Sequence, residues 1–208
     1  MTTHHAPTWE VTESKGYETS WVECDGSVLR ARGRAVGTVP EVYWISYELE
    51  TGPDFVTRRL WVRAEMSART RELDLRRGDD GRWTADGAPV DGVDGALDCD
   101  LGLCPLTNTM PVRRHGLHLG PGERDFLMAW VSVPDLTVRP SRQKYTHLER
   151  TERTERTERT ERTERTERGA RGARVRYVAG DFRSEVEFDG DGLVLDYPGL
   201  ARRLPAAR

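Results

Sequence analysis

The residues best suited to chemistry gather in one stretch near the middle of the chain, DCDLGLCPLTNTMPVRR, which starts at Asp98 and ends at Arg114. This stretch combines carboxylates, an amide, hydroxyls and guanidinium groups, a polar variety that a core-filling segment does not need. Guanidinium groups bind phosphate or carboxylate through paired hydrogen bonds, and amides and hydroxyls suit sugar hydroxyls. The candidates for such a polar clamp are Thr107, Asn108, Thr109, Arg113 and Arg114.

Two carboxylates in the same stretch offer other chemistries. Asp98 and Asp100 share one face if they lie on a β-strand, roughly 6.5–7 Å apart. Such a pair resembles those that hold a divalent cation beside a nucleotide-sugar diphosphate, so the alternative to binding is a metal-dependent enzyme acting on sugar or lipid-linked substrates. A third possibility is purely structural, with the two carboxylates and Asn108 capping turns and joining an internal network. The arginines expected in that network are Arg58, Arg59 and Arg113.

Other catalytic patterns are missing from the sequence. It contains no G-x-S-x-G elbow and no glycine-rich phosphate loop. His115 and His118 are three residues apart, which in a strand places them on opposite faces. The three cysteines, at positions 24, 99 and 104, lack C-x-x-C spacing, so we expect reduced thiols rather than a disulfide framework or a zinc site. We therefore expect no cofactor and no catalysis.

Prolines shape the polar stretch. Pro105 and Pro111 flank the Thr-Asn-Thr segment, restrict φ and remove two backbone donors, which predicts a stiff loop. If a strand resumes at Arg113 and Arg114, the two side chains point to opposite faces and only one of them enters a cavity. The sequence leaves open which one.

Strands are the elements that must position these residues. Apolar and polar side chains alternate with period 2 over 42–49, and similar runs occupy 55–66, 69–76, 126–133 and 182–188. Turn signals separate the runs at short, regular intervals, which is typical of all-β proteins. We predict a single domain over residues 9–205, built as an antiparallel, curved and barrel-like sheet, with a flexible tail over residues 1–8.

A low-complexity insertion interrupts the predicted domain. Residues 148–174 read LER, then TER six times, then GAR twice, without apolar side chains larger than alanine beyond the first leucine. Such a segment has little to bury, although its Glu-to-Arg spacing of four residues favours a helix slightly. We predict a solvated helix or coil between two strands, and the sequence assigns it no role.

Composition narrows the classes of partner. The formal net charge is -3 and the isoelectric point about 6.0, without the basic face typical of nucleic-acid binders. No apolar run is long enough to cross a membrane, and the N-terminus lacks the apolar region of a signal peptide. We expect a cytoplasmic protein that binds no nucleic acid.

The polar stretch also carries a resemblance to a known family. The pattern P-x-T-N-T-x-P-x-R-R, from Pro105 to Arg114, is similar to that of the bacterial putative glycolipid-binding proteins, formerly classed as a domain of unknown function. Further pieces match in the same order. They are Val42-Tyr43, Thr57-Arg58-Arg59, Gly81-Arg82-Trp83, Asp98-x-Asp100-Leu101, Gln143-Lys144-Tyr145-Thr146, Phe182-Arg183 and Asp191-Gly192-Leu193-Val194.

This resemblance implies an all-β, barrel-like protein that holds a lipid or glycolipid. We expect an apolar cavity lined by Ile45, Tyr47, Leu60 and Val131, with Trp44 and Trp61 as further walls. The head group would be held by Asn108, Arg113 or Arg114, Arg58 and Tyr145. The sequence determines neither the identity of this small amphipathic ligand nor the oligomeric state.

Overall fold

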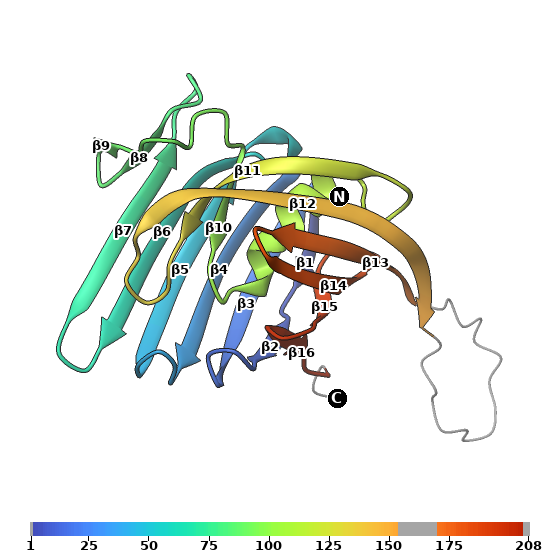
Figure 1. Cartoon of the computed structure of the whole chain (residues 1–208), viewed down its shortest axis with the longest axis horizontal. Coiled ribbons are helices and arrows are strands. Elements are labelled where there is room, and N and C mark those ends of the chain that lie inside the picture. The colour runs from blue at the N-terminus through green and yellow to red at the C-terminus, as the bar shows by residue number, and fades with distance from the viewer. Residues whose placement is uncertain (1, 154–169, 206–208) are drawn as a thin grey trace.

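The computed structural model describes residues 2–153 and 170–205, which form one large curved sheet with a short helical segment inside it (Figure 1). The strands are β1 (Thr2–His5), β2 (Thr8–Val11), β3 (Gly16–Asp25), β4 (Val28–Gly37), β5 (Tyr43–Thr51), β6 (Thr57–Met66), β7 (Thr70–Arg77), β8 (Trp83–Ala85), β9 (Ala88–Pro89), β10 (Asp98–Leu101), β11 (Glu123–Val131), β12 (Val138–Arg153), β13 (Ala170–Ala179), β14 (Phe182–Asp189), β15 (Val194–Tyr197) and β16 (Ala201–Arg203). The helical elements are η1 (Pro53–Phe55), η2 (Pro105–Asn108) and α1 (Thr109–Arg114).

Alternating side chains decide which face of each strand is buried. In β5, Tyr43, Ile45 and Tyr47 point into the core and are at most 3% exposed, whereas Trp44 between them is 61% exposed. The same alternation continues in β6, where Leu60 is completely buried. Period-2 patterning therefore predicts these strands correctly, because burial follows from the pleat alone.

The strand order confirms the predicted all-β, curved and mostly antiparallel sheet. It runs β10-β11-β12-β13-β14-β15-β16-β2-β3-β4-β5-β6-β7-β8-β9, with β1 added to β3. Only the β10–β11 pair is parallel among the described strands. The order ends at β10 and at β9, so the hydrogen-bonded sheet is open within the part of the chain that the structure describes, rather than closed as a barrel.

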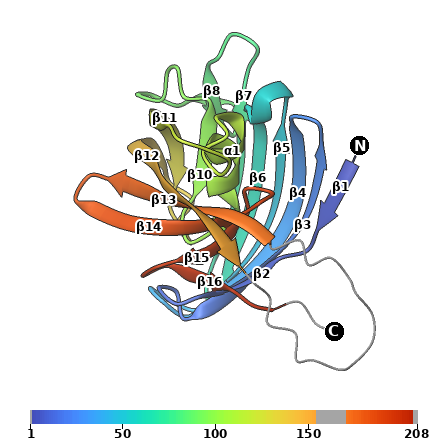
Figure 2. The same ribbon diagram turned by 90° about the vertical axis from the view of Figure 1, so that its right-hand side faces the viewer.

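One end of this sheet folds into its own concave side. Figures 1 and 2 show β10 and α1 inside the curve, between strands β11–β14 and strands β3–β7. There β10 contacts the start of β6. The Thr57 amide donates to the Leu97 carbonyl at 3.0 Å, and the Cys99 amide donates to the Thr57 hydroxyl at 3.2 Å. The polar stretch is thus carried into the interior.

The stretch itself differs from the expected loop and strand. It forms η2 followed directly by α1, so Arg113 and Arg114 lie on a helix rather than on opposite faces of a strand. Pro105 begins η2 and Pro111 lies in the first turn of α1, where a missing amide hydrogen costs nothing. The prolines therefore mark helix starts. A helix of six residues is too short to show a 3.6-residue apolar period.

Two expectations at the edges of the domain also change. The N-terminal residues expected to form a flexible tail instead include β1, which pairs with β3 through Thr2 opposite Asp25. The flanks of the charged insertion extend the β12–β13 hairpin as far as Arg153 opposite Ala170. The rest of the insertion, 154–169, lies outside the described residues. Within the described chain, no helix has the length and apolar character needed to span a bilayer.

Candidate functional site

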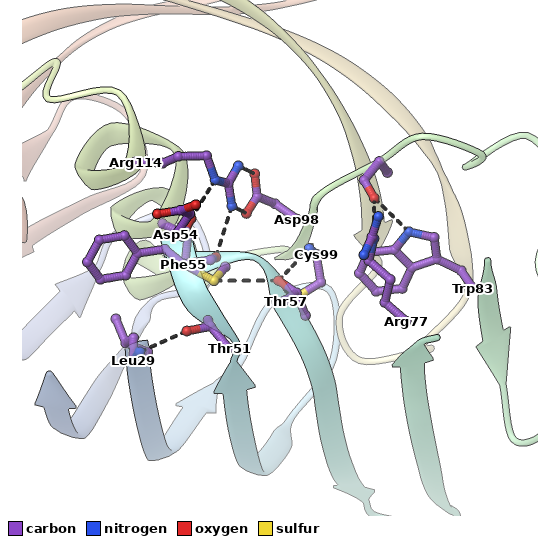
Figure 3. Close-up of polar contacts among 12 residues, drawn as sticks. Leu29, Thr51, Asp54, Phe55, Thr57, Arg77, Trp83, Asp98, Cys99 and Arg114 are labelled. Atoms are coloured by element: carbon purple, nitrogen blue, oxygen red, sulfur yellow. Dashed lines mark hydrogen bonds and ion pairs between the residues drawn. The ribbon is translucent and has the colours of Figure 1, made fainter. Parts of the chain in front are cut away.

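Arg114 is committed to holding the fold together. Its guanidinium group forms a bidentate ion pair with Asp98, at 2.6 and 2.7 Å, and both side chains are buried. It also donates to the carbonyls of Asp54 (2.7 Å) and Phe55 (2.9 Å), as Figure 3 shows. Asp54 and Phe55 both have positive φ, so Arg114 stabilises the strained turn η1. The Nε, Nη1 and Nη2 atoms of Arg114 are therefore all engaged within the protein.

The other predicted guanidinium groups also lie away from a common site. Arg113 donates to the Asp191 carbonyl at 2.9 Å and stacks on the Phe55 ring, 4.9 Å from its centroid. Arg58 is exposed on β6, next to Gly52. The expected arginine clamp is therefore not assembled, because α1 turns its two arginines toward η1 and toward the Asp189–Gly192 turn.

The remaining polar residues of the stretch do come together. Asp100 accepts hydrogen bonds from the Thr107 hydroxyl at 2.9 Å and from the Gln143 amide at 2.6 Å. The Tyr145 hydroxyl donates to Asn108 Oδ1 at 2.8 Å and to Gln143 Oε1 at 3.2 Å. These five residues form one continuous network between β10, η2 and β12, which we call the Asp100 network. Of the predicted site residues, Thr107, Asn108 and Tyr145 belong to it.

Burial shifts the pKa values of two groups in this network. It raises the pKa of Asp100, although the hydrogen bonds from Gln143 and Thr107 oppose that rise. It raises the pKa of Tyr145 well above its ordinary value, so that phenol remains a donor. The network therefore presents a carboxyl group whose oxygens are already oriented by neutral donors.

A cleft of about 640 Å³ opens onto the Asp100 network. Its lining includes Asp100, Asn108 and Cys104, which we call the floor, and the other lining residues are mainly apolar and aromatic. The wall residues are Val39, Pro40, Leu101, Leu103, Trp130, Val133, Tyr177, Ala179, Phe182, Tyr197 and Leu200. The polar residues at its edge are Glu13, Arg139 and Ser141. Such a mixture of apolar wall and few polar groups is typical of small-molecule sites.

The aromatic wall is a packed assembly. Tyr145, Tyr177 and Tyr197 pack edge to face, with ring centroids 5.1 and 5.7 Å apart, and Phe182 packs on the last two. Elsewhere in the cleft lining, the Arg139 guanidinium lies over the Trp130 ring, 4.2 Å from its centroid. Flat ring faces beside a polar floor are suited to the apolar faces of sugar rings.

A second polar cluster lies directly behind the cleft. The carboxyl Oε1 of Glu18 accepts from Cys104 Sγ (2.8 Å), Ser20 Oγ (2.9 Å) and the Tyr47 hydroxyl (2.5 Å). Glu18 is fully buried, and its Oε2 has no hydrogen-bond partner among the residues that the structure describes. Desolvation raises the pKa of Glu18 to about 7, against the lowering effect of the three hydrogen bonds. Burial and the neighbouring carboxyl raise the pKa of Cys104 as well, so it stays a thiol.

Several residues expected around a cavity lie elsewhere. Ile45, Tyr47, Leu60 and Val131 are packed in the core and do not line the cleft. Trp44 is on the outer face of β5. Trp61 lines a shallow groove on the outer face of the sheet, and Thr109 is buried in α1. Period-2 patterning identifies one face of a strand, but it does not distinguish a packed core from a cavity wall.

The sequence interpretation missed several residues of the site. Trp130, Tyr177 and Phe182 line the cleft, Gln143 orients Asp100, and Glu18 lies behind it. Gln143 stands in one of the motif pieces that carry the family resemblance, so that signal was available. No sequence motif marks Glu18 as buried. It lies in β3 at a position whose side chain points into the core.

Asp98 and Asp100 do not form the metal site that the alternative enzyme interpretation requires. Both oxygens of Asp98 bind Arg114, and those of Asp100 accept from Thr107 and Gln143. Among residues 2–153 and 170–205, no three histidine, cysteine or acidic side chains are arranged to hold a metal ion. All three cysteines are free and buried, as the sequence predicts.

Comparisons with known proteins agree with this fold. The family model described as "Putative glycolipid-binding" matches residues 6–166 and 155–203. A crystal structure of a DUF1089 family protein from Pseudomonas aeruginosa superposes with a TM-score of 0.66 at 26% sequence identity, covering 90% of this chain and 92% of that one. No protein with a curated description matches the chain.

Proposed function

The chain belongs to the family described as putative glycolipid-binding, and on that premise we propose that its cleft holds an amphipathic, sugar-bearing lipid. The observation that carries the proposal is the position of Asp100 at the floor of a largely apolar cleft, with both oxygens oriented by Thr107 and Gln143. The apolar walls would bury the hydrocarbon part of the ligand, at about 25 cal/mol per Å² of apolar surface removed from water.

The polar groups of the cleft favour a hydroxyl-rich head group over an anionic one. Asp100 and Glu13 both border the cleft, and carboxylates accept hydrogen bonds from hydroxyls but repel phosphates. Arg113 and Arg114, which would have suited a phosphate, bind elsewhere in the protein. Arg139 is the arginine that lines the cleft, and its guanidinium group is stacked on Trp130.

Binding of two simple amphiphiles tests the proposal. Octyl glucoside and octyl phosphate share one chain and differ in head group, and each is titrated calorimetrically below the concentration at which it forms micelles. We expect the glucoside to bind more tightly. Asp100→Asn should weaken glucoside binding about ten-fold, as the loss of a charge-assisted hydrogen bond predicts, and should improve phosphate binding.

A matched variant controls for the change of charge. Asp125→Asn removes the same charge from an exposed position on β11 that does not line the cleft, so both affinities should stay at the wild-type values. The proposal fails if neither amphiphile binds, or if Asp100→Asn leaves the preference for glucoside over phosphate unchanged.

A further inference from the structure

Exposed apolar side chains concentrate beside the part of the cleft that the exposed residues Val39 and Pro40 line, which we call its mouth. Tyr17, Val39, Val42 and Trp44 are 50%, 39%, 60% and 61% exposed. Together with the half-buried Val36, we call them the rim patch. The four exposed members of the rim patch are half of the large hydrophobic residues that are exposed in the described chain. Single exposed apolar residues are common, whereas contiguous groups of them mark interaction sites.

Strand register shows that the rim patch is continuous. Tyr17 lies opposite Val36, and Val36 lies opposite Trp44, which places the three in one row across β3, β4 and β5. Val42 precedes Trp44 by two residues and extends the row toward the turn. In that turn, Val39 and its neighbour Pro40 line the cleft itself. The apolar surface therefore extends from the outer face of the sheet to the turn that lines the cleft, with Glu41 standing between Pro40 and Val42.

Some of the charged residues near the mouth are paired with one another. Arg69 binds Glu41 and, at 3.4 Å, Asp135, which links the turns after β4, β6 and β11. Glu65, opposite Trp44, accepts from Arg63 at 3.0 Å. This pairing holds the turns in place and lowers the cost of moving their carboxylates toward an apolar medium.

We propose that the rim patch docks the protein on a lipid bilayer, so that the mouth of the cleft meets the membrane from which its ligand comes. This inference rests on the proposed function, since an amphipathic ligand with a long chain resides in a bilayer. Trp and Tyr favour the interface between hydrocarbon and water, and the rim patch offers one of each beside two exposed valines. The sequence predicts a ligand-binding role for Trp44. In the docking proposal, Trp44 contacts the membrane because it lies on the outer face of β5.

Flotation of the full chain with vesicles of phosphatidylcholine and phosphatidylglycerol tests the docking. Val42→Ser combined with Trp44→Ser should weaken vesicle binding about ten-fold or more, because it removes the two most exposed apolar side chains of the rim patch. Leu119→Ser is the matched control. Leu119 is 54% exposed but follows α1, which contacts η1 at the opposite end of β5. Its loss should leave vesicle binding unchanged.

Titration with monomeric octyl glucoside separates docking from ligand binding. The double variant should bind this soluble probe as the wild type does, since neither Val42 nor Trp44 lines the cleft. Docking is overturned if the wild type does not float with vesicles, or if the double variant floats equally well, even when both bind the glucoside. If the wild type does not bind the glucoside but its vesicle binding depends on Val42 and Trp44, the proposed function is refuted. The inference that the rim patch docks on a bilayer would then still stand.

Discussion

Glu18 should give the stability of the fold a pH dependence of known sign. Burial raises its pKa from 4.5 to about 7, so between these values the folded protein binds more protons than the unfolded chain. The free energy of unfolding must therefore fall as the pH rises through this window. The interval between 4.5 and about 7, at roughly 1.4 kcal/mol per pH unit, corresponds to about 3 kcal/mol for this group.

Replacement of the carboxyl by an amide isolates this effect. Glu18→Gln keeps an oxygen that can accept from Cys104, Ser20 and Tyr47. It places an NH₂ group where Oε2 lacks a partner within the described part of the chain. Protonated Glu18 also leaves the polar group at the Oε2 position without a partner. The variant and the wild type should therefore have similar free energies of unfolding near pH 4.5. Near pH 8, the variant should be more stable by about 3 kcal/mol.

Urea denaturation across this pH range, followed by tryptophan fluorescence, measures the difference. Glu23→Gln, at an exposed position on the same strand, should retain the pH dependence of the wild type. Parallel stability profiles for the wild type and Glu18→Gln would refute the reasoning, because they would mean that the burial of Glu18 does not disfavour its charged form.

Two further predictions concern the polar stretch and use the same denaturation assay. Arg114→Ala should lower the free energy of unfolding by about 3–5 kcal/mol, since it leaves Asp98 buried without its ion pair, and the half-exposed Arg113→Ala should cost much less. Equal losses for the two would contradict the assigned roles. Tyr145→Phe should cost about 1–3 kcal/mol by leaving Asn108 Oδ1 unsatisfied, and a neutral effect would show that the Asp100 network does not hold the cleft floor.

Local patterning accounts for the parts of the fold that could be predicted. The strands over 43–51 and 57–66 follow from alternation, because a pleated strand requires only period 2 to bury one face. The parallel pairing of β10 with β11 could not be predicted in this way. It depends on the chain between Leu101 and Glu123 folding back through η2 and α1, which is a long-range event.

Residue types in the sequence predict some members of the candidate site, but not the directions of their side chains. Asn108 and Tyr145 were both expected to bind the ligand, and the structure joins them by a hydrogen bond across 37 positions. Residue type alone could not show that Arg114 faces Asp98, because the direction of a side chain on a six-residue helix depends on how that helix packs. The guanidinium groups that resembled a ligand clamp therefore belong to the supporting structure.

Native mass spectrometry of the protein purified without detergent tests the central claim most directly. The wild type should carry an adduct of lipid mass that organic extraction releases and that contains sugar. Ala179→Trp, which fills the cleft from its wall, should lose the adduct, and Ala88→Trp, on an exposed edge strand outside the cleft, should keep it. A wild type that carries no lipid and takes up no added glycolipid, or an Ala179→Trp variant that carries as much as the wild type, would contradict the assignment of this cleft as the ligand site.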